Sequence, residues 1–299
     1  MHAALNLFLA TRPAFLTITL LGCLIGLTVP SPSKQSIVIN LLTFALVILV
    51  HAAANVINDY YDHLNGSDQN NHNRISPFTG GSRFIQDQLL KPTQIFHLGV
   101  ALIILSTAIG LYFCKQTTWL LIPLGITGVI FGWAYSAPPL QLMSRGILGE
   151  LSIAIAWSLV VIGFASIQTA SFVYQAIPMG LAYGLMVSNI LLVNQIPDIE
   201  ADRTARKLTL ATRTNGNELS NWYLGIIIAA YIFQLIGVHY FSASIGTLLT
   251  VLLLPIFVHC AKTIRMAKKQ RDQTKKLIIL NLVSIHLYTL LLFIGMLLD

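Results

Sequence analysis

Long apolar runs constrain this chain more than any other feature, because each is long enough to cross a lipid bilayer as a helix. About nine such runs occur, at residues 14–30, 36–58, 93–114, 117–135, 147–167, 171–197, 219–239, 243–261 and 277–298. Charged residues make up only 10% of the chain, against about 25% in a typical soluble domain. A backbone in lipid must satisfy its own hydrogen bonds, so the runs predict helices. We expect an all-α, multi-pass integral membrane bundle of about nine transmembrane helices, forming one domain over residues 1–299.

Lysine and arginine are divided unevenly between the loops on the two sides of this bundle. Sixteen of the eighteen lie on the side of the N-terminus, and only Lys34 and Lys115 lie on the other. Because short basic loops stay in the cytoplasm, we expect a cytoplasmic N-terminus, an external C-terminal Asp299 and residence in a bacterial inner (plasma) membrane. The net charge of +7 is explained by this placement and requires no nucleic-acid partner. The basic residues within 262–276 are interpreted as an anchor on anionic lipid.

Two short acidic stretches follow apolar runs and lie on the cytoplasmic side. They hold six of the eleven acidic residues of the chain, namely Asp59, Asp62, Asp68, Asp198, Glu200 and Asp202. Carboxylates beside lipid are costly unless they are paired or bind a metal, so they are candidates for function. Residues 59–92, 136–146 and 198–218 form the larger loops on the same side. We therefore expect an active site at the cytoplasmic mouth of the bundle, capped by these loops.

The spacing of the acidic stretches favours a magnesium site. Asn58 and Asp62 are four residues apart, as are Asn194, Asp198 and Asp202 in series. Residues four apart share a helix face. Carboxylate and amide oxygens suit Mg²⁺, which usually takes one or two carboxylates together with phosphate oxygens of a substrate. Apart from His63, which follows Asp62, both stretches lack the imidazole and thiolate ligands typical of zinc or iron sites.

Basic residues occupy the same loops, which indicates that a metal and a diphosphate bind together. Carboxylates would hold Mg²⁺ while guanidinium and ammonium groups contact phosphate oxygens; the candidates are Arg74, Arg145, Arg203, Arg206, Lys207 and Arg213. Pro197 is expected to kink or end its helix, because proline removes a backbone hydrogen bond. Glu200 lies two residues from both neighbouring acids and should point away from them.

At these residues the sequence resembles the UbiA-type intramembrane aromatic prenyltransferases, which have nine helices and two aspartate-rich motifs on the cytoplasmic side. Asn58 and Asp62 match the first two positions of the first motif, the third position is Gly66, and Asp68 follows. This form, with Arg-Ile-Ser-Pro at 74–77, is similar to the 1,4-dihydroxy-2-naphthoate polyprenyltransferase branch. Residues 135–150 resemble the third cytoplasmic signature of the family, and 198–213 its second motif and tail.

The chain departs from that pattern in three places. Arg206 stands where the family usually has a glycine before the lysine, Thr214 and Asn215 replace a Leu-Gly pair, and residues 79–82 read Thr-Gly-Gly-Ser in place of Leu-Arg-Gly. These departures bear on the identity of the acceptor more than on the prenyl-diphosphate chemistry.

The resemblance implies Mg²⁺-dependent transfer of a polyprenyl group from polyprenyl diphosphate to an aromatic acceptor at the lipid bilayer. The acceptor implied is 1,4-dihydroxy-2-naphthoate, in menaquinone biosynthesis. The residues expected to hold metal are Asp62, Asp68, Asp198 and Asp202. The residues expected to bind or orient substrates are Asn58, Asn194, Arg74, Arg145 and Lys207. Tyr135 is expected to face the reacting centre, and with Asp62, Asp198 and Asp202 completes the catalytic set.

Alternatives remain open at this point. In one alternative the reaction is the same but the acceptor is 4-hydroxybenzoate, homogentisate or a chlorophyll-type alcohol. In another the protein belongs to a different class and transports a divalent cation or an anionic lipid. Two features count against transport: all candidate charges lie on one side, and apart from Pro197 no broken helix is expected at matching positions of the two halves. The sequence leaves the oligomeric state open.

Asp68 has two interpretations. Gly66 favours a turn, so the helix should end near Leu64, and a turn at Asn65 and Gly66 would swing Asp68 back towards the metal. In the other interpretation Asp68 only caps the loop.

Overall fold

The computed structural model describes residues 2–29, 35–267 and 271–298 of the chain. Lys34, Lys268, Lys269 and Asp299, which entered the orientation argument, lie outside the described residues. Within these ranges, eight helices are long and apolar enough to cross a membrane, and Leu121–Ser136 is a shorter apolar helix. These helices correspond one to one with the nine predicted runs. The prediction of an all-α, multi-pass membrane bundle is therefore confirmed.

The order of the elements follows the order of the apolar runs. The first half of the chain contains α1 (His2–Ala10), η1 (Pro13–Phe15), α2 (Leu16–Thr28), α3 (Ile37–Asn65), α4 (Pro92–Gln116) and α5 (Leu121–Ser136). The second half contains α6 (Leu148–Thr169), α7 (Ala176–Asn194), α10 (Gly216–Tyr240), η3 (Ile245–Leu253), α11 (Leu254–Ala267) and α12 (Arg271–Met296). The short elements between them are η2 (Leu142–Ser144), β1 (Arg145–Gly146), α8 (Ile199–Thr204), β2 (Leu208–Thr209) and α9 (Leu210–Arg213).

Two details of the predicted spans differ from the structure. Helix α1 was not predicted, because its apolar stretch is too short to span a bilayer. It is separated from α2 by Arg12, whose φ is 56°, and by Pro13, which opens η1. The run at 243–261 is divided into the 3₁₀ helix η3 and the α-helix α11.

Two predicted helix ends are confirmed, and both position the acidic stretches. Helix α3 continues past its apolar run to Asn65, and Gly66 caps it in the left-handed conformation with φ of 83°. Glycine adopts this conformation without steric cost. Helix α7 ends at Asn194, three residues before Pro197. Asp198 then stands immediately before α8.

Helix α7 lies at the centre of the bundle, with α2, α6, α10 and α12 packed around it. Its apolar span is 78% buried, against 17% for α3 and for α4. Gly184 lets α6 approach closely, since a Cβ there would overlap the carbonyl oxygen of Ala154. The main apolar core is built on this helix and includes Met179, Tyr183 and Met186.

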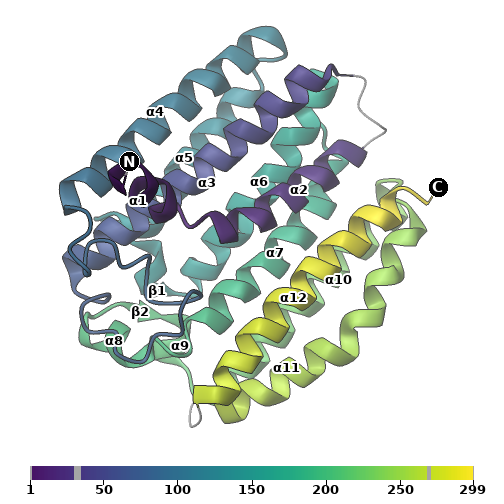
Figure 1. The fold of residues 1–299 in the computed structure, drawn as a ribbon. Helices are drawn as coiled ribbons and strands as arrows, with labels where there is room; N and C mark the ends of the chain where they lie inside the picture. The colour runs from purple at the N-terminus through teal and green to yellow at the C-terminus, as the bar shows by residue number, and fades with distance from the viewer. Residues whose placement is uncertain (1, 30–34, 268–270, 299) are drawn as a thin grey trace.

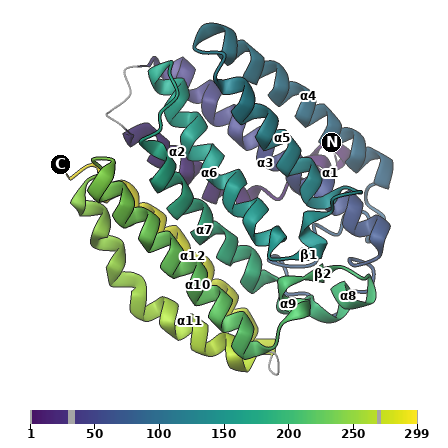
Figure 2. The same cartoon turned by 180° about the vertical axis from the view of Figure 1, so that it is seen from behind.

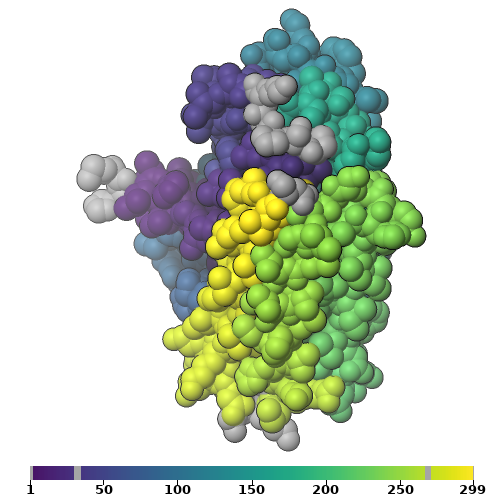
Figure 3. Space-filling view, turned by 90° about the vertical axis from the view of Figure 1, so that its right-hand side faces the viewer, coloured from purple at the N-terminus to yellow at the C-terminus, as the bar shows by residue number. Residues whose placement is uncertain are grey.

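The polar loops gather at one end of the bundle (Figures 1 and 2), where α8, α9, β1 and β2 lie together. Strands β1 and β2 pair in parallel, with Arg145 opposite Leu208 and Gly146 opposite Thr209. This pairing joins the loop after α5 to the loop after α8. On the side of the molecule seen in Figure 3, α12 borders residues from the N-terminal part of the chain.

Candidate active site

A cavity of about 290 Å³ opens at the loop end of the bundle, between α2, α3, α5, α6 and α7. Residues of both acidic stretches line its polar end, and the loop from 67 to 81 forms part of its wall. Apolar side chains that include Phe131, Val187 and Ile190 line the deeper part. The cavity is therefore amphipathic, with charge at the loop end and hydrocarbon towards the membrane interior.

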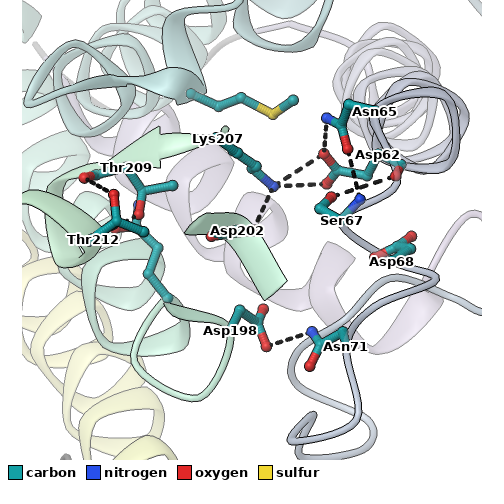
Figure 4. A network of polar contacts seen from close by, with 12 residues as sticks. Asp62, Asn65, Ser67, Asp68, Asn71, Asp198, Asp202, Lys207, Thr209 and Thr212 are labelled. Carbon is teal, nitrogen blue, oxygen red and sulfur yellow. Dashed lines mark hydrogen bonds and ion pairs between the residues drawn. The ribbon is translucent and has the colours of Figure 1, made fainter. Parts of the chain in front are cut away.

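Lys207 bridges the two acidic stretches (Figure 4). Its Nζ donates to the two carboxylate oxygens of Asp62 at 2.9 and 3.0 Å and lies 3.6 Å from an oxygen of Asp202. Burial lowers the pKa of Lys207, but Asp202 and Asp62 outweigh that effect and leave it well above its ordinary value. The ammonium group thus provides one positive charge between carboxylates that the chain supplies from distant segments.

The backbone around Lys207 explains its position. Its N–H donates to the carbonyl oxygen of Asp202 at 2.7 Å, and β2 begins at the next residue. The turn needs a left-handed residue, which is Arg206 with φ of 55°. A glycine would meet this requirement at lower steric cost. The conformation gives a physical reason for the glycine usual at this position in the resembling family.

Asp68 lies in the cavity wall, as the turn at Gly66 predicted. Its residue surface is only 4% exposed. Gly80 and Gly81 have φ of 74° and 71°, and a Cβ on Gly81 would overlap the Asp68 carboxylate. Burial, with the nearby charges of Asp62 and Asp59, raises the pKa of Asp68 to about 8.

Asp198 and Asp202 form the other wall of the polar end. Asn71 donates from Nδ2 to Asp198 Oδ1 at 2.7 Å, which ties the loop after α3 to the second acidic stretch. Burial raises the pKa of Asp198 above its ordinary range, against hydrogen bonds that lower it. Burial raises the pKa of Asp202 to about 7, although Lys207 acts in the opposite direction.

Arg12 and Asp59 belong to the site; Asp59 was one of the six acidic candidates, but no metal-binding, substrate-binding or catalytic role was predicted for either residue. They form an ion pair, and Arg12 also donates to Asn58 Oδ1 at 3.3 Å. Asp59 accepts from the backbone N–H of Ser82 at 3.2 and 3.3 Å, so the pair holds the loop over the cavity. In the sequence analysis Arg12 counted only as one of the basic residues that predict the orientation in the membrane. Its proximity to Asp59 depends on the break between α1 and α2, which the sequence signalled only by Pro13.

Trp157 was also missed, because a tryptophan within an apolar run carries no special signal. It lines the cavity, and its indole N–H has no hydrogen-bond partner among the described residues. The ring of His51 contacts it edge-on at a centroid distance of 4.8 Å.

The predicted substrate-binding residues are divided between the cavity and the surface. The cavity is lined by Asn58, Asn194 and Tyr135. Asn58 donates to Asp62 Oδ2 at 3.1 Å. Arg145 is exposed and donates to the carbonyl oxygen of Pro139 at 2.8 Å. Arg74 packs on Gly80 outside the cavity wall. The roles of Arg74 and Arg145 stay predictions, and each would require a side-chain movement.

Glu200 lies outside the cavity wall and accepts a hydrogen bond from Asn73 at 2.8 Å. Its position agrees with the expectation that it points away from the neighbouring acids. It is therefore a suitable control for charge changes near the site.

The residues at the polar end fit Mg²⁺ bound together with a substrate phosphate. All the candidate ligands are oxygen atoms, and Asn71 Oδ1 is buried without a partner in the described part of the chain. Among the described residues, no three carboxylate, imidazole or thiolate groups form a preassembled metal site. This is compatible with an ion that takes one or two carboxylates and completes its shell with phosphate oxygens and water.

Comparison with known proteins gives consistent matches. The model of the UbiA prenyltransferase family matches residues 19–285. A Bacillus subtilis protein named 1,4-dihydroxy-2-naphthoate octaprenyltransferase is 30% identical over 207 residues, which cover 67% of this chain and 63% of that protein. The matched region thus spans less than two thirds of that relative. A Dictyostelium discoideum protein named UbiA prenyltransferase domain-containing protein 1 is 27% identical, covering 77% of this chain and 70% of that protein.

The fold also matches solved structures. A UbiA homologue from Archaeoglobus fulgidus, solved with dimethylallyl diphosphate (DMAPP) and Mg²⁺, superposes with a TM-score of 0.62 at 15% identity. The superposition covers 96% of this chain and 99% of that one. At this identity the likeness concerns the arrangement of the helices.

Proposed function

Because the chain belongs to the UbiA prenyltransferase family, we propose that it transfers a polyprenyl group from polyprenyl diphosphate to a carbon of an aromatic ring. The observation that carries this proposal is the position of Lys207 between Asp62 and Asp202 at the polar end of an otherwise apolar cavity. A diphosphate with a hydrocarbon chain has the same division between charge and hydrocarbon.

The charged end of the cavity would bind and activate the diphosphate. Mg²⁺, held by Asp62, Asp68, Asp198 and Asp202, would neutralise the charge that develops on the departing diphosphate. Lys207, which now donates to Asp62, would donate to the phosphate oxygens instead when the substrate is bound. Asn58 and Asn194 would orient the carboxylates, and Asn71 Oδ1 offers a further oxygen that the sequence had not suggested.

The apolar part of the cavity would protect the allylic cation that forms when the carbon–oxygen bond ionises. Water must be kept away from such a cation, and apolar side chains such as Val187 and Ile190 in the wall would offer water no hydrogen bonds. The rings of Trp157 and Tyr135 lie in the same wall. An aromatic face attracts a cation by about 0.5–2 kcal/mol, so these rings would stabilise it until the acceptor attacks.

We propose 1,4-dihydroxy-2-naphthoate as the acceptor, which would place the enzyme in menaquinone biosynthesis. The name of the Bacillus subtilis relative and the form of the first motif support this choice. An anionic acceptor would enter at the loop end, where Lys207 and Arg12 provide positive charge. The alternative acceptors 4-hydroxybenzoate and homogentisate are separated from it by the experiment below.

The test uses the purified protein in lipid nanodiscs with Mg²⁺, geranyl or octaprenyl diphosphate and a panel of aromatic acids. We expect diphosphate release together with a prenylated product, detected by mass spectrometry, and a complete loss of both in excess chelator that Mg²⁺ restores. Turnover that is undiminished in chelator would contradict the metal site. Release of no diphosphate with any acceptor, combined with ion or lipid flux across vesicles, would instead support the transporter interpretation.

We further propose that the chain is one domain over residues 1–299 in a bacterial inner membrane, with a cytoplasmic N-terminus. The uneven division of Lys and Arg supports this orientation. A reporter inserted near Asn215 should be cytoplasmic and one fused after Asp299 external. Detection of both on one side would contradict the proposed topology.

A further inference from the structure

Glu150 is a buried acidic residue that the proposed chemistry does not use. It lies in the first turn of α6, is only 1% exposed and does not line the cavity at the loop end. No basic group among the described residues forms an ion pair with it. An acidic side chain at the end of a membrane-spanning helix is costly to bury without a partner, so its contacts should reveal what it does.

The side chain of Glu150 contacts that of Gln195. Glu150 Oε1 accepts a hydrogen bond from Gln195 Nε2 at 2.8 Å, and Gln195 Oε1 accepts one from the backbone N–H of Ala211 at 3.2 Å. A backbone N–H can only donate, so the carboxamide oxygen must face Ala211 and its NH₂ group must face Glu150. Glu150 therefore serves Gln195 as an acceptor, and this contact sets the orientation of the carboxamide.

Gln195 in turn fixes the segment that carries Lys207. Ala211 belongs to the first turn of α9, where backbone N–H groups have no partner within the helix. Because Ala211 is fully buried, the partner must come from the protein, and it is the carboxamide oxygen of Gln195. Lys207 lies directly before β2, and β2 leads into α9 without an intervening residue. The position of α9 thus determines where the Lys207 side chain starts.

Gln195 also fixes the second acidic stretch. It follows Asn194 at the end of α7, and its backbone carbonyl oxygen accepts from the N–H of Asp198 at 3.1 Å. The segments that carry Asp198 and Lys207 therefore meet at one residue, and Glu150 holds that residue from α6. The parallel pairing of β1 and β2 joins the start of α6 to the start of α9 a second time.

We propose that Glu150 is a positioning residue: through Gln195 it holds Asp198 and Lys207 at the separation that Mg²⁺ and a diphosphate require. This inference rests on the proposed function. Glu150 Oε2 is buried without a partner in the described part of the chain, so the residue contributes one accepting oxygen and no second link. Removing a group that orients metal-binding side chains typically changes metal affinity or activity by about 10–100-fold.

The first test compares Glu150→Leu with Glu150→Gln in nanodiscs. Leucine has a similar size but no acceptor, whereas glutamine keeps an oxygen for Gln195. With geranyl diphosphate, Glu150→Leu should raise the Mg²⁺ concentration for half-maximal activity by about tenfold and leave the KM of the aromatic acceptor within about twofold. Glu150→Gln should restore the wild-type Mg²⁺ requirement. Equal losses in the two variants would overturn the proposal, because an accepting oxygen would then not be what the residue supplies.

A second comparison asks whether Glu150 acts through Gln195. Effects of two residues in one hydrogen-bond network are not additive, so Glu150→Leu combined with Gln195→Leu should need no more Mg²⁺ than Gln195→Leu alone. Effects that multiply would overturn the proposal. Ser158→Ala is the control for losing a buried polar group of α6, because its hydroxyl donates to the carbonyl oxygen of Ala154 in the same helix and it does not line the cavity. This control should keep the wild-type Mg²⁺ requirement.

Hydrogen exchange separates this proposal from the proposed function, because it requires neither turnover nor bound Mg²⁺. The amide of Ala211, followed by mass spectrometry in a peptide covering residues 205–213, should exchange faster in Glu150→Leu and Gln195→Leu and at the wild-type rate in Glu150→Gln. Peptides from α10 should exchange as in the wild type.

Wild-type exchange of Ala211 in Glu150→Leu would overturn the positioning role even if turnover fell, as would faster exchange throughout the bundle, which is not a local effect. Failure of the wild-type protein to transfer a prenyl group would contradict the proposed function and leave the exchange result in force.

Discussion

The two sides of the bundle differ in what their buried polar groups contact. On the side formed by α10, η3 and α12, Gln234 has every hydrogen-bonding group paired inside the protein: it donates to Thr247 and Thr250 and accepts from Tyr288 at 2.9 Å. On the side formed by α3, α5 and α6, polar side chains such as Asn58 and Asp62 face a cavity. Figure 1 shows the two sets of helices on opposite flanks of α7.

This contrast indicates that one side of the bundle contributes mainly to stability and the other mainly to the chemistry. Buried polar groups that are paired with each other fix helices α10, η3 and α12 in one arrangement. The cavity side keeps charges that are only partly compensated, and it leaves open glycines between α4, α5 and α6. Substitutions should consequently affect stability on the first side and activity on the second.

The largest effect is expected for Asp62→Asn. It removes a carboxylate that contacts Lys207 and is expected to hold the cation, so kcat/KM should fall by about 10²–10³-fold while the thermal midpoint changes little. Product formation and thermal unfolding are measured on the same nanodisc preparation. Glu200→Gln, outside the cavity, is the control and should keep full activity. A large loss of stability in Asp62→Asn without a specific loss of turnover would break the comparison.

Asp68→Asn should be the next most damaging change on the cavity side. If Asp68 supplies the ligand missing at Gly66, turnover should fall by about 10²-fold and the Mg²⁺ concentration needed for half-maximal activity should rise. Titration of activity with Mg²⁺ measures both. Near-normal turnover with an unchanged Mg²⁺ requirement would show that Asp68 only caps the loop.

Acidification should lower activity through the same carboxylates. Asp202 has a pKa of about 7 and Asp68 of about 8, both raised, so these groups bind protons and lose their charge as pH falls through those values. Because the cation competes with the protons, kcat/KM should decrease by about tenfold per pH unit between pH 8 and pH 7, where one group is protonated, and by about 100-fold per pH unit well below pH 7, where both are. Higher Mg²⁺ should shift that decrease to lower pH. A profile that does not respond to Mg²⁺ would assign the pH dependence to other groups.

On the paired side, Gln234→Leu should lower stability and spare the chemistry. It leaves the Tyr288 hydroxyl without its acceptor, at a cost of about 1–2 kcal/mol, and reduces the thermal midpoint by roughly 2–4 °C for each of these kcal/mol. Leu235→Ala, at an exposed neighbour on α10, should be close to wild type. Turnover per folded molecule should be unchanged, and a selective loss of turnover in Gln234→Leu would contradict the division of roles.

The smallest effect is expected for Arg206→Gly. Arg206 is exposed and has φ of 55°, so glycine should relieve about 0.5–1 kcal/mol of backbone strain. Thermal unfolding should show a slightly higher midpoint with normal activity. Ala205→Gly, at φ of −79°, is the matched control and should be slightly destabilising. A loss of stability in Arg206→Gly would mean that its side chain contributes more than its backbone costs.

The features that the sequence could predict are those set by local chemistry. Apolar run length predicted the spans, Gly66 predicted the end of α3 and the approach of Asp68 to the cavity, and Pro197 predicted the end of α7. Each depends on a property of a single segment. Periodicity then identified Asn58 and Asp62, which line the cavity as expected.

The features that could not be predicted depend on how distant segments meet. Lys207 was a substrate-binding candidate, but its position between Asp62 and Asp202 depends on the left-handed turn at Arg206 and on the pairing of two-residue strands, which are too short to have a sequence signal. Arg12 reaches Asp59 only because the chain turns between α1 and α2. Arg74 and Arg145 lie in the predicted loops, but neither of them lines the cavity.

The bridge made by Lys207 has a consequence for the biogenesis of the protein. If the negative charge of the buried aspartates were compensated only by a bound cation, the helices of the newly inserted chain could not assemble until that cation had bound. Lys207 supplies part of that compensation from within the chain, through its contacts with Asp62 and Asp202. We therefore expect insertion and assembly of the helices to proceed without the ion.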